Sequence, residues 1–507
     1  MTENSSTTAF KPLDLLDQVR QHLQVGQQAY LVGGAVRDLL LQRSVHDMDF
    51  AVSGDVRHLA RKTANALGGA FYVMDSMHET MRVILSLSDR ERLFLDFSAL
   101  RGNDLQEDLL ARDFTINAIA MDLNAGNAIV DPLGGARDLH EHQLRTCAPD
   151  SFQNDPVRVL RAIRLSLELE LHIMPETLRQ ARQAAGDLCR VSVERQRDEL
   201  FRMLEGQHPE SALRLMQALG VLDLVLSELT QMQGVLQSKP HTLDVWEHTL
   251  KVLRWLEKLL GVLVGEYVEN SASDLMLGLV VLRLGRYRER LVEHFDAQLI
   301  PDRSIRSLLM LAALFHDAGK PATRSVETDG RIRFFGHEKQ SAGLVEAFGI
   351  RFALSSAEIE RLSKIILGHL RVHQLSDGRQ SISRKAIYRF FRDAGVAGVD
   401  ICLLSLADML ATYGVTLDAE LWQCELDTCR ELLEAWWERP DEIVRPPRLV
   451  NGNEIMVHFD IPAGPRLGKL LEAIREAQAM GQIADRKTAL EFAETWLTMQ
   501  PEKEGEE

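Results

Sequence analysis

The chain has 507 residues, with 58 basic and 74 acidic side chains and a formal net charge of −16 at pH 7. This length predicts several domains, because a single domain usually has about 100–200 residues. The 45% hydrophobic content supports several packed cores and excludes a mainly disordered chain. The net charge argues mildly against nucleic-acid binding, because phosphate contacts require Lys and Arg, although their local distribution matters more.

The sequence also indicates a cellular compartment. No run of about 20 apolar residues predicts a membrane span, and the N-terminus lacks the basic and apolar parts of a secretory signal. The five cysteines are odd in number and include no CxxC pair, which excludes a disulfide scaffold or a zinc ribbon. We therefore expect a reduced, cytoplasmic protein that does not bind a membrane.

The order of expected elements predicts an α+β protein. Strands are expected at 29–32, 49–52, 82–87 and 92–97, the last two joined by a turn at Ser88-Asp89, and helices at 35–42 and 56–67. From about residue 155 helical periodicity dominates, for example at 157–169, 194–204, 249–263 and 466–480. The fold class is therefore a small N-terminal α/β head followed by a long, mostly helical body.

The strongest local signal is the stretch LVGGAVRDLLLQRSVHDMDFAVSGD. Asp47 and Asp49 are two residues apart on an expected strand, so both side chains face one side. Neighbouring carboxylates repel each other unless a cation lies between them, and hard oxygen ligands suit Mg²⁺. Gly33 and Gly34 precede a helix whose backbone N–H groups can hold phosphate, and Arg37 can add a charge-assisted contact. An isolated Asp-x-Asp pair is usually solvated, but the upstream glycine motif favours a functional site.

This stretch resembles the signature of the polymerase β-like nucleotidyltransferases, specifically the bacterial class II tRNA nucleotidyltransferases (CCA-adding enzymes) and bacterial poly(A) polymerases. The resemblance implies that Asp47 and Asp49 are catalytic and hold Mg²⁺ together with a third carboxylate. Asp96, in RLFLDFSAL, is the preferred third residue, and Asp131, in DPLGG, is the alternative.

The next segment of similarity is ARDFTINAIAMD, which resembles the family's RRDFTINA motif. This resemblance implies that Arg112, Asp113 and Asn117 help to bind the sugar and triphosphate of the incoming nucleotide. Ala111 replaces the first arginine of the motif, so any role of that side chain is lost. A helix start capped by Asp113 or Thr115 is compatible with the same role.

A third motif, NDPVRVLRAIRL, resembles the family's EDxxRxLRAxRF. The resemblance implies that Asp155 and Arg158 read the base: the carboxylate accepts from the exocyclic amine of cytosine or adenine, and the arginine donates to the ring. Arg161 and Arg164 are expected to extend this nucleotide-binding face. Asn154 replaces the family's glutamate, which leaves the switch between CTP and ATP open.

A fourth motif, VERQRDELFRML, resembles the family's ERxxxEL motif. We expect this segment to be a structural helix.

The middle of the chain contains an HD doublet among further histidines. A lone helical histidine is usually a core residue. This set instead resembles the HD domain of metal-dependent phosphohydrolases, whose four metal ligands match His248, His316, Asp317 and Asp408. His337 and His369 match the extra histidines of two-metal versions. Mixed nitrogen and oxygen ligands suit a divalent transition metal, and the resemblance implies hydrolysis of 2′,3′-cyclic or monoester phosphates.

The resemblance divides the chain into four parts. These are a catalytic head (1–150), a helical neck for base recognition and RNA binding (151–235), an HD domain (236–415) and a helical C-terminal region that contacts tRNA (416–507). Residues 265–305 match no known motif. The sequence shows no basic stripe for tRNA and does not determine the oligomeric state.

The function that the resemblance implies is template-independent addition of CMP and AMP, from CTP and ATP, to the 3′ end of tRNA, with two Mg²⁺ ions. Two alternatives remain open. One is a poly(A) polymerase or an enzyme that adds only C or only A. The other is an HD phosphohydrolase whose head only binds nucleotide or RNA.

Overall fold

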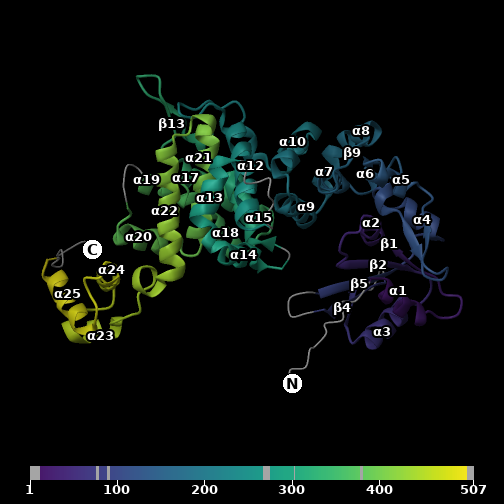
Figure 1. Cartoon of the computed structure of the whole chain (residues 1–507), viewed down its shortest axis with the longest axis horizontal. Helices are drawn as coiled ribbons and strands as arrows, with labels where there is room; N and C mark the ends of the chain where they lie inside the picture. The colour runs from purple at the N-terminus through teal and green to yellow at the C-terminus, as the bar shows by residue number, and fades with distance from the viewer. Residues whose placement is uncertain are drawn as a thin grey trace. The chain divides into compact units, whose positions relative to one another are not determined.

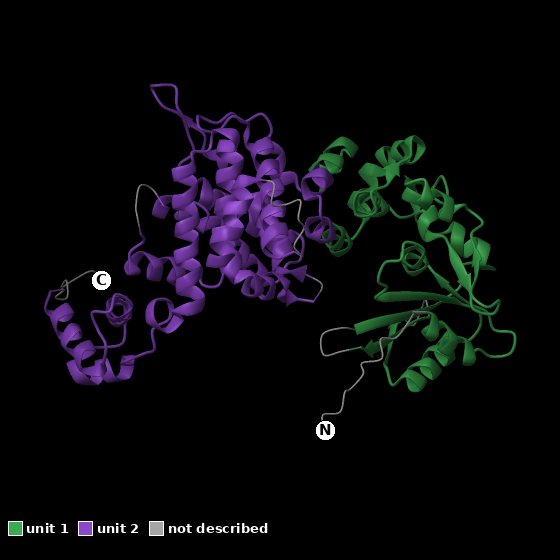
Figure 2. Cartoon of the chain, viewed as in Figure 1, with its two compact units in different colours: residues 1–199, 214–224 green, residues 200–213, 225–507 purple. Residues whose placement is uncertain are grey.

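The computed structural model describes residues 12–75, 79–87, 92–265, 274–301, 303–376 and 381–499. The chain forms two compact units, residues 1–199 with 214–224 and residues 200–213 with 225–507 (Figure 2). The strands of the large sheet all lie in the N-terminal part, and helices dominate the rest (Figure 1). This arrangement confirms the predicted α+β fold class. The expected turn at Ser88-Asp89 lies outside the described residues.

A seven-stranded sheet in the order β3-β4-β5-β2-β1-β6-β7 forms the framework of the first unit. The strands are β1 (Ala29–Val32), β2 (Asp47–Val52), β3 (Ala70–Asp75), β4 (Thr80–Ser86), β5 (Arg92–Ala99), β6 (Ala120–Asp122) and β7 (Ala128–Val130). The β2–β5 pair is parallel, and the other neighbouring pairs are antiparallel. The parallel pair places Asp49 opposite Asp96.

Along the central strands, successive side chains alternate between the face that packs into the core and the face that carries the candidate site. Met48 and Phe50 on β2 are buried, whereas Asp47 and Asp49 are exposed, because successive side chains of a strand point to opposite faces. Phe50 stacks on Phe97 of β5 with the ring centroids 4.8 Å apart. Helix α3 (Val56–Leu67) packs against β4 and β5, and α1 (Pro12–Gln21) packs against α3. Both aspartates therefore lie on a strand whose other face packs into the core.

The remaining elements of the first unit are short helices and one small parallel pair, β8 (Gln143–Leu144) with β9 (His172–Ile173). The helices are α2 (Gly34–Leu40), α4 (Leu105–Leu110), α5 (Gly135–His140), α6 (Ser151–Asn154), α7 (Arg158–Glu168), α8 (Pro175–Ala184), the first half of α9 (Val193–Glu205), most of α10 (Pro209–Leu219) and the start of α11 (Leu222–Val225). Single 3₁₀ turns lie at Thr115–Asn117 (η1) and Ala185–Arg190 (η2).

The second unit is a helical bundle with two small hairpins. Its helices are α12 (Val245–Leu263), α13 (Leu275–Leu284), α14 (Arg288–Asp296), α15 (Ile305–Phe315), α16 (Lys320–Thr323), α17 (His337–Arg351), α18 (Ser356–Gly368), α19 (Arg371–Ser376), α20 (Arg384–Ala394), α21 (Ala397–Tyr413) and α22 (Ala419–Glu438). The hairpins are β10 (Gln298–Ile300) with β11 (Arg303–Ser304) and β12 (Ser325–Val326) with β13 (Ile332–Arg333). Helix α21 packs against α12, α15, α18 and α22.

By length and composition alone, the helical stretch Ala397–Thr416 could cross a membrane, but 78% of its most apolar window is buried inside the protein. Its hydrophobicity therefore matches its central place in the bundle.

A separate small core lies at the C-terminal end. Helices α23 (Gly452–Phe459), α24 (Pro465–Ala479) and α25 (Arg486–Met499) pack around Ile455, Leu470 and Ile474. Glu476 of α24 accepts ion pairs from Lys385 and Arg389 of α20, each at 2.8 Å. Charged contacts thus join this C-terminal core to the helical bundle.

Candidate functional site

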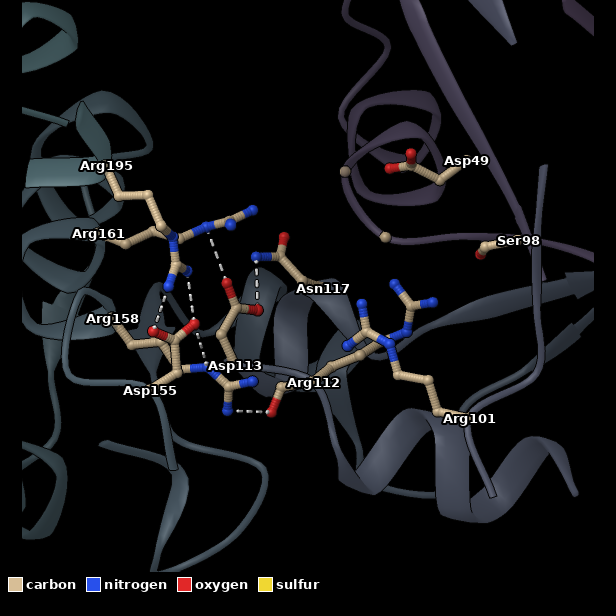
Figure 3. Close-up of a pocket in the computed structure, with 12 residues that line it drawn as sticks. Asp49, Ser98, Arg101, Arg112, Asp113, Asn117, Asp155, Arg158, Arg161 and Arg195 are labelled. Atoms are coloured by element: carbon tan, nitrogen blue, oxygen red, sulfur yellow. Dashed lines mark hydrogen bonds and ion pairs between the residues drawn. The ribbon is translucent and has the colours of Figure 1, made fainter. Parts of the chain in front are cut away.

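A polar pocket of about 300 Å³ lies within the first unit (Figure 3). It brings together residues from four segments that the sequence singled out, at 33–34, 49, 112–117 and 155–161. Its lining residues are Gly33, Gly34, Asp49, Ser98, Arg101, Arg112, Asp113, Asn117, Asp155, Arg158, Arg161 and Arg195. The pocket is therefore strongly basic and contains three carboxylates.

The glycine turn begins α2 at the edge of this pocket. Gly33 has a φ of 77°, in the left-handed region that favours glycine. A Cβ atom at Gly33 would lie 3.2 Å from Nη1 of Arg112 and 3.4 Å from Oδ2 of Asp49. The missing side chain therefore lets the backbone N–H groups at the start of α2, the Arg112 guanidinium and the Asp49 carboxylate converge, as a phosphate site requires.

The carboxylates of the head have different partners. Asp96 accepts two hydrogen bonds from Arg82, at 2.8 and 2.7 Å, and lies opposite Asp49 in the sheet register. Although Asp49 is exposed at the pocket wall, partial loss of hydration among the surrounding protein atoms raises the pKa of its carboxyl, and the neighbouring charges of Asp96 and Asp47 raise it further, against the opposing effect of Arg112. A cation beside Asp47 and Asp49 would relieve this repulsion, so the two residues suit a divalent metal ion.

The two candidates for the third carboxylate are distinguished by their surroundings. Asp131 accepts from the backbone N–H groups of Gly135 and Ala136, at 2.7 and 2.9 Å, at the start of α5, and it does not line the pocket. Asp96 is the carboxylate that faces Asp49, but its oxygens are held by Arg82. In the described part of the head, no three ligating residues bring their ligand atoms within 4.8 Å of one another, as two groups of three do in the HD region.

A chain of polar side chains, three of which line the pocket, links α2 to α7. Arg37 donates from Nη1 to Oδ1 of Asn117 (2.8 Å), Asn117 donates to Oδ1 of Asp113 (3.1 Å), and Arg161 pairs with Oδ2 of Asp113 (2.8 Å). Arg37 is 8% exposed and does not line the pocket, although the sequence predicted a phosphate contact. In this structure its guanidinium instead orients Asn117.

The residues expected to recognise the base are fixed by partners of their own. Arg158 donates to the backbone carbonyls of Ala111 and Arg112, at 2.9 and 3.1 Å, and to Oγ of Ser151 at 2.7 Å. The two oxygens of Asp155 accept from Arg195, at 3.0 and 2.7 Å. Asp155 and Arg158 both line the pocket, and these contacts hold them at its wall.

Helix α9, expected to be a structural helix, also contributes Arg195 to the pocket wall, where it holds Asp155. No pattern in the sequence could reveal this, because Arg195 reaches an acid 40 residues away. Another residue of α9, Glu199, does play a structural role and pairs with Arg164 at 2.7 Å. Arg164 also pairs with Glu168 and does not line the pocket, so it supports α7 from behind in this structure.

A second cluster, the HD cluster, lies in the helical bundle. Two groups of ligating residues are each close enough to hold one metal ion: His248, His316 and Asp408, and Asp317, His337 and His369. Asp317 connects the groups, because its Oδ2 lies 3.2 Å from Nε2 of His316 and its Oδ1 lies 3.3 Å from Nε2 of His337. All six residues named from the sequence therefore meet in one buried place.

The hydrogen bonds of the histidine rings fit metal ligation. His316, His337 and His369 each direct Nδ1 at a backbone carbonyl, at 2.7, 2.8 and 2.6 Å. This contact favours the tautomer whose Nε2 has a free lone pair. Nε2 of His337 faces Nε2 of His369 at 3.3 Å, and burial lowers the pKa of His369 to about 3. Two facing lone pairs repel each other, so the cluster is suited to a cation.

Behind the HD cluster, His373 contacts Asp408 and is itself held by Glu425. His373 contacts Oδ2 of Asp408 at 3.2 Å through Nε2 and Oε1 of the fully buried Glu425 at 2.9 Å through Nδ1. Burial opposes protonation of His373, but Glu425 and Asp408 together raise its pKa to about 10. This pair could not be predicted, because nothing in the sequences HLRVH and CELD indicates a long-range contact.

A basic pocket of about 820 Å³ borders the HD cluster at His337 and Lys320. Lys320 contacts Oδ2 of Asp317 at 2.7 Å. Lys239, Arg331, Arg333 and the exposed ring of Phe335 form part of its wall. Phosphate esters carry the opposite charge to this wall.

Three family models match the chain in the order expected from the motifs. The poly A polymerase head domain matches residues 29–145, the probable RNA- and SrmB-binding site of polymerase A matches residues 170–233, and the HD domain matches residues 281–411.

Whole-chain relatives support the same assignment. The chain is 33% identical to the A-adding tRNA nucleotidyltransferase of Deinococcus radiodurans, across 93% of this chain and 96% of that protein. It is 31% identical to the CC-adding tRNA nucleotidyltransferase of Thermus thermophilus, across 93% and 94%. The chain therefore belongs to the tRNA nucleotidyltransferase family, and it is an enzyme of that family.

Solved structures share the fold. A CCA-adding enzyme in complex with CTP superposes with a TM-score of 0.59 at 21% identity, covering 96% of each chain. The Thermotoga maritima CCA-adding enzyme in complex with tRNA gives 0.54 at 21% identity, covering 97% of each.

Proposed function

We propose that this chain transfers CMP and AMP from CTP and ATP to the 3′ end of tRNA and completes the CCA sequence there. The single observation that carries the proposal is one pocket lined by Asp49, by the glycine turn at Gly33 and Gly34, and by Asp155 and Arg158. The names of the relatives that align over nine-tenths of the chain support tRNA as the acceptor.

Asp47 and Asp49 would hold Mg²⁺ in this site, with phosphate oxygens and water as the other ligands. When bound, Mg²⁺ neutralises the triphosphate and lowers the pKa of the attacking 3′-hydroxyl. Arg112 and the N–H groups after Gly33 bind phosphate, and their position beside Asp49 aligns the α-phosphate with the acceptor. Asp96, fixed by Arg82, adds negative charge that strengthens cation binding by Asp49.

Base selection is assigned to Asp155 and Arg158. The carboxylate can accept from the exocyclic amine of cytosine or adenine, and the guanidinium can donate to the ring, whereas uracil and guanine present the wrong pattern. Arg195 and the backbone carbonyls that Arg158 contacts hold the two groups in place, so the protein provides a fixed template.

The proposal is tested with three tRNA transcripts. They end in the discriminator base, in C and in CC, and each is incubated with CTP alone and with ATP alone. We expect two C additions to the first transcript and one A addition to the third. Addition of A only, or of C only, would show a partial enzyme, which the A-adding and CC-adding relatives make the second candidate. Strong extension of unrelated RNA with ATP alone would contradict the proposal.

The HD cluster supports a second activity, the metal-dependent hydrolysis of phosphate esters. Six candidate ligating residues, with Asp317 connecting the two groups of three and a basic pocket at the edge of the cluster, suit two divalent transition-metal ions and an anionic substrate. When bound, such ions lower the pKa of an attacking water. The test compares hydrolysis of 2′,3′-cyclic AMP and p-nitrophenyl phosphate by the wild type and by an H316A/D317A variant. Equal rates would overturn this assignment.

A further inference from the structure

Arg101 is the one pocket arginine that neither the motifs nor the mechanism above uses. It follows β5 and lines the pocket, and Figure 3 shows its guanidinium directed into the same space as that of Arg112. The Arg101 side chain makes no hydrogen bond or ion pair with any residue that the structure describes. In contrast, Arg112, Arg161 and Arg195 each pair with an aspartate, and Arg158 donates to backbone carbonyls.

The backbone that carries Arg101 is held firmly. Asp108, which is 1% exposed, accepts from the backbone N–H of Arg101 through Oδ1 (3.1 Å) and from Nε of Arg112 through Oδ2 (3.0 Å). One buried carboxylate therefore sets the position of both arginines. Gly102, with a φ of +83°, allows the tight turn that follows, and a Cβ there would lie within 2.3 Å of Oε2 of Glu107. This loop is thus built to present the Arg101 side chain.

The charges around Arg101 are not balanced by the protein. Asp108 directs its second oxygen to Arg112 and leaves the Arg101 guanidinium without a carboxylate partner among the described residues. Burial and the like charge of Arg101 contribute to a lowered pKa of Arg158. A guanidinium that lies near other cations without a carboxylate partner of its own is repelled by them, and a polyanionic ligand removes that cost.

We propose that Arg101 is a nucleotide-binding residue and forms, with Arg112, a two-arginine clamp on the triphosphate of the incoming nucleotide. This inference rests on the proposed function, since a triphosphate is the substrate of that reaction. A phosphate of the tRNA 3′ end has the same chemistry and is the rival ligand. The triphosphate is favoured because Arg112 lies beside Asp49 and the glycine turn, which is where the metal-bound phosphates belong.

The test measures equilibrium binding of CTP and ATP with Mg²⁺, in the absence of tRNA, to the full-length protein. R101A should weaken binding of both nucleotides about tenfold or more, and R101K should recover part of it, because a charge-assisted contact is lost and then partly restored. Inorganic tripolyphosphate, used as a competitor, should bind R101A more weakly than it binds the wild type, by a factor similar to that for the nucleotides. R179A serves as the control, since Arg179 is exposed on α8 and, among the residues that the structure describes, pairs only with Glu176.

Kinetics with saturating nucleotide distinguish the two ligands. We expect the KM for tRNA to change little in R101A. A raised KM for tRNA in R101A, with unchanged nucleotide binding, would overturn the proposal. So would an R101A variant in which neither the KM for tRNA nor the affinity for nucleotide changes. Failure of the wild type to extend any tRNA while it still binds nucleotide through Arg101 would count against the proposed function and not against the clamp.

Discussion

Arg195 on α9 donates to both carboxylate oxygens of Asp155, at 3.0 and 2.7 Å, and thereby fixes one half of the pair assigned to base recognition (Figure 3). A carboxylate held by a bidentate arginine has a defined orientation. This contact gives the pocket a wall that comes from two segments of the chain 40 residues apart.

The first prediction concerns this contact. R195A should lower kcat/KM for the correct nucleotide about tenfold and should reduce discrimination against UTP, because Asp155 loses its orientation. Steady-state addition with CTP, ATP and UTP measures both effects. R190A is the matched control, since Arg190 is exposed and its one ion pair within the described part of the chain is with Asp187. Unchanged discrimination in R195A would show that Asp155 does not depend on Arg195.

The second prediction concerns the glycine turn. G33A should lower nucleotide addition by roughly 100-fold, because its Cβ would lie 3.2 Å from Arg112 and displace the phosphate-binding groups. G26A is a close control, since Gly26 has a similar φ of +81° and nothing within 4 Å of its Cβ position. Both variants carry backbone strain of about 1 kcal/mol. Equal activities of the two would refute the crowding argument.

The third prediction concerns the residues behind the HD cluster. H373A should reduce the affinity of the cluster for a divalent transition metal roughly 10- to 100-fold, because Asp408 loses the group that orients it. Titration of the metal-free protein with Mn²⁺ or Ni²⁺, followed by metal analysis, measures the change. H172A, on the small strand β9 of the head, is the control. Metal affinity equal to the wild type would exclude this orienting role.

The fourth prediction concerns Glu257 on α12. Burial raises the pKa of Glu257 to about 7, and its side chain is 22% exposed. The folded state therefore holds this proton more tightly than the unfolded state, and stability is lost as the pH rises from about 4.5 to 7. E257Q should stabilise the second unit by about 1–2 kcal/mol at pH 8 and have little effect at pH 4.5. Urea unfolding of the wild type and E257Q at pH 4.5 and pH 8 measures the change in unfolding free energy. An equal change at the two pH values would contradict the burial argument.

The sequence predicted the elements that have strong local patterns. The strand at 29–32 and the helix at 56–67 have the predicted bounds, because apolar periodicity and glycine or aspartate boundaries mark them. Strand β3 was not predicted. Its residues are largely exposed at the edge of the sheet, so the run lacks a buried, alternating face.

The candidate sites likewise contain residues that the sequence predicted and residues that it did not. Residues in short motifs lie in the two places that the spacing and the resemblance suggested. Asp49 and Arg112 line the polar pocket, and His316 lies in the HD cluster. Residues whose role depends on a distant partner could not be found, as Arg195 and His373 show, because a single sequence contains no record of which helices pack together. Conversely, Arg37 and Arg164 have the right spacing, but their partners Asn117 and Glu199 hold them behind the pocket.

The central claim is that Asp47 and Asp49 hold the metal that drives nucleotide transfer to tRNA. Its most direct test is single-turnover incorporation of labelled CTP and ATP into tRNA by a D47A/D49A variant, with H316A/D317A as the matched control. We predict that the first variant loses at least about 1,000-fold in rate, because the metal's charge stabilisation is removed, while the second keeps wild-type incorporation. Wild-type incorporation by D47A/D49A, with loss in H316A/D317A, would contradict the account.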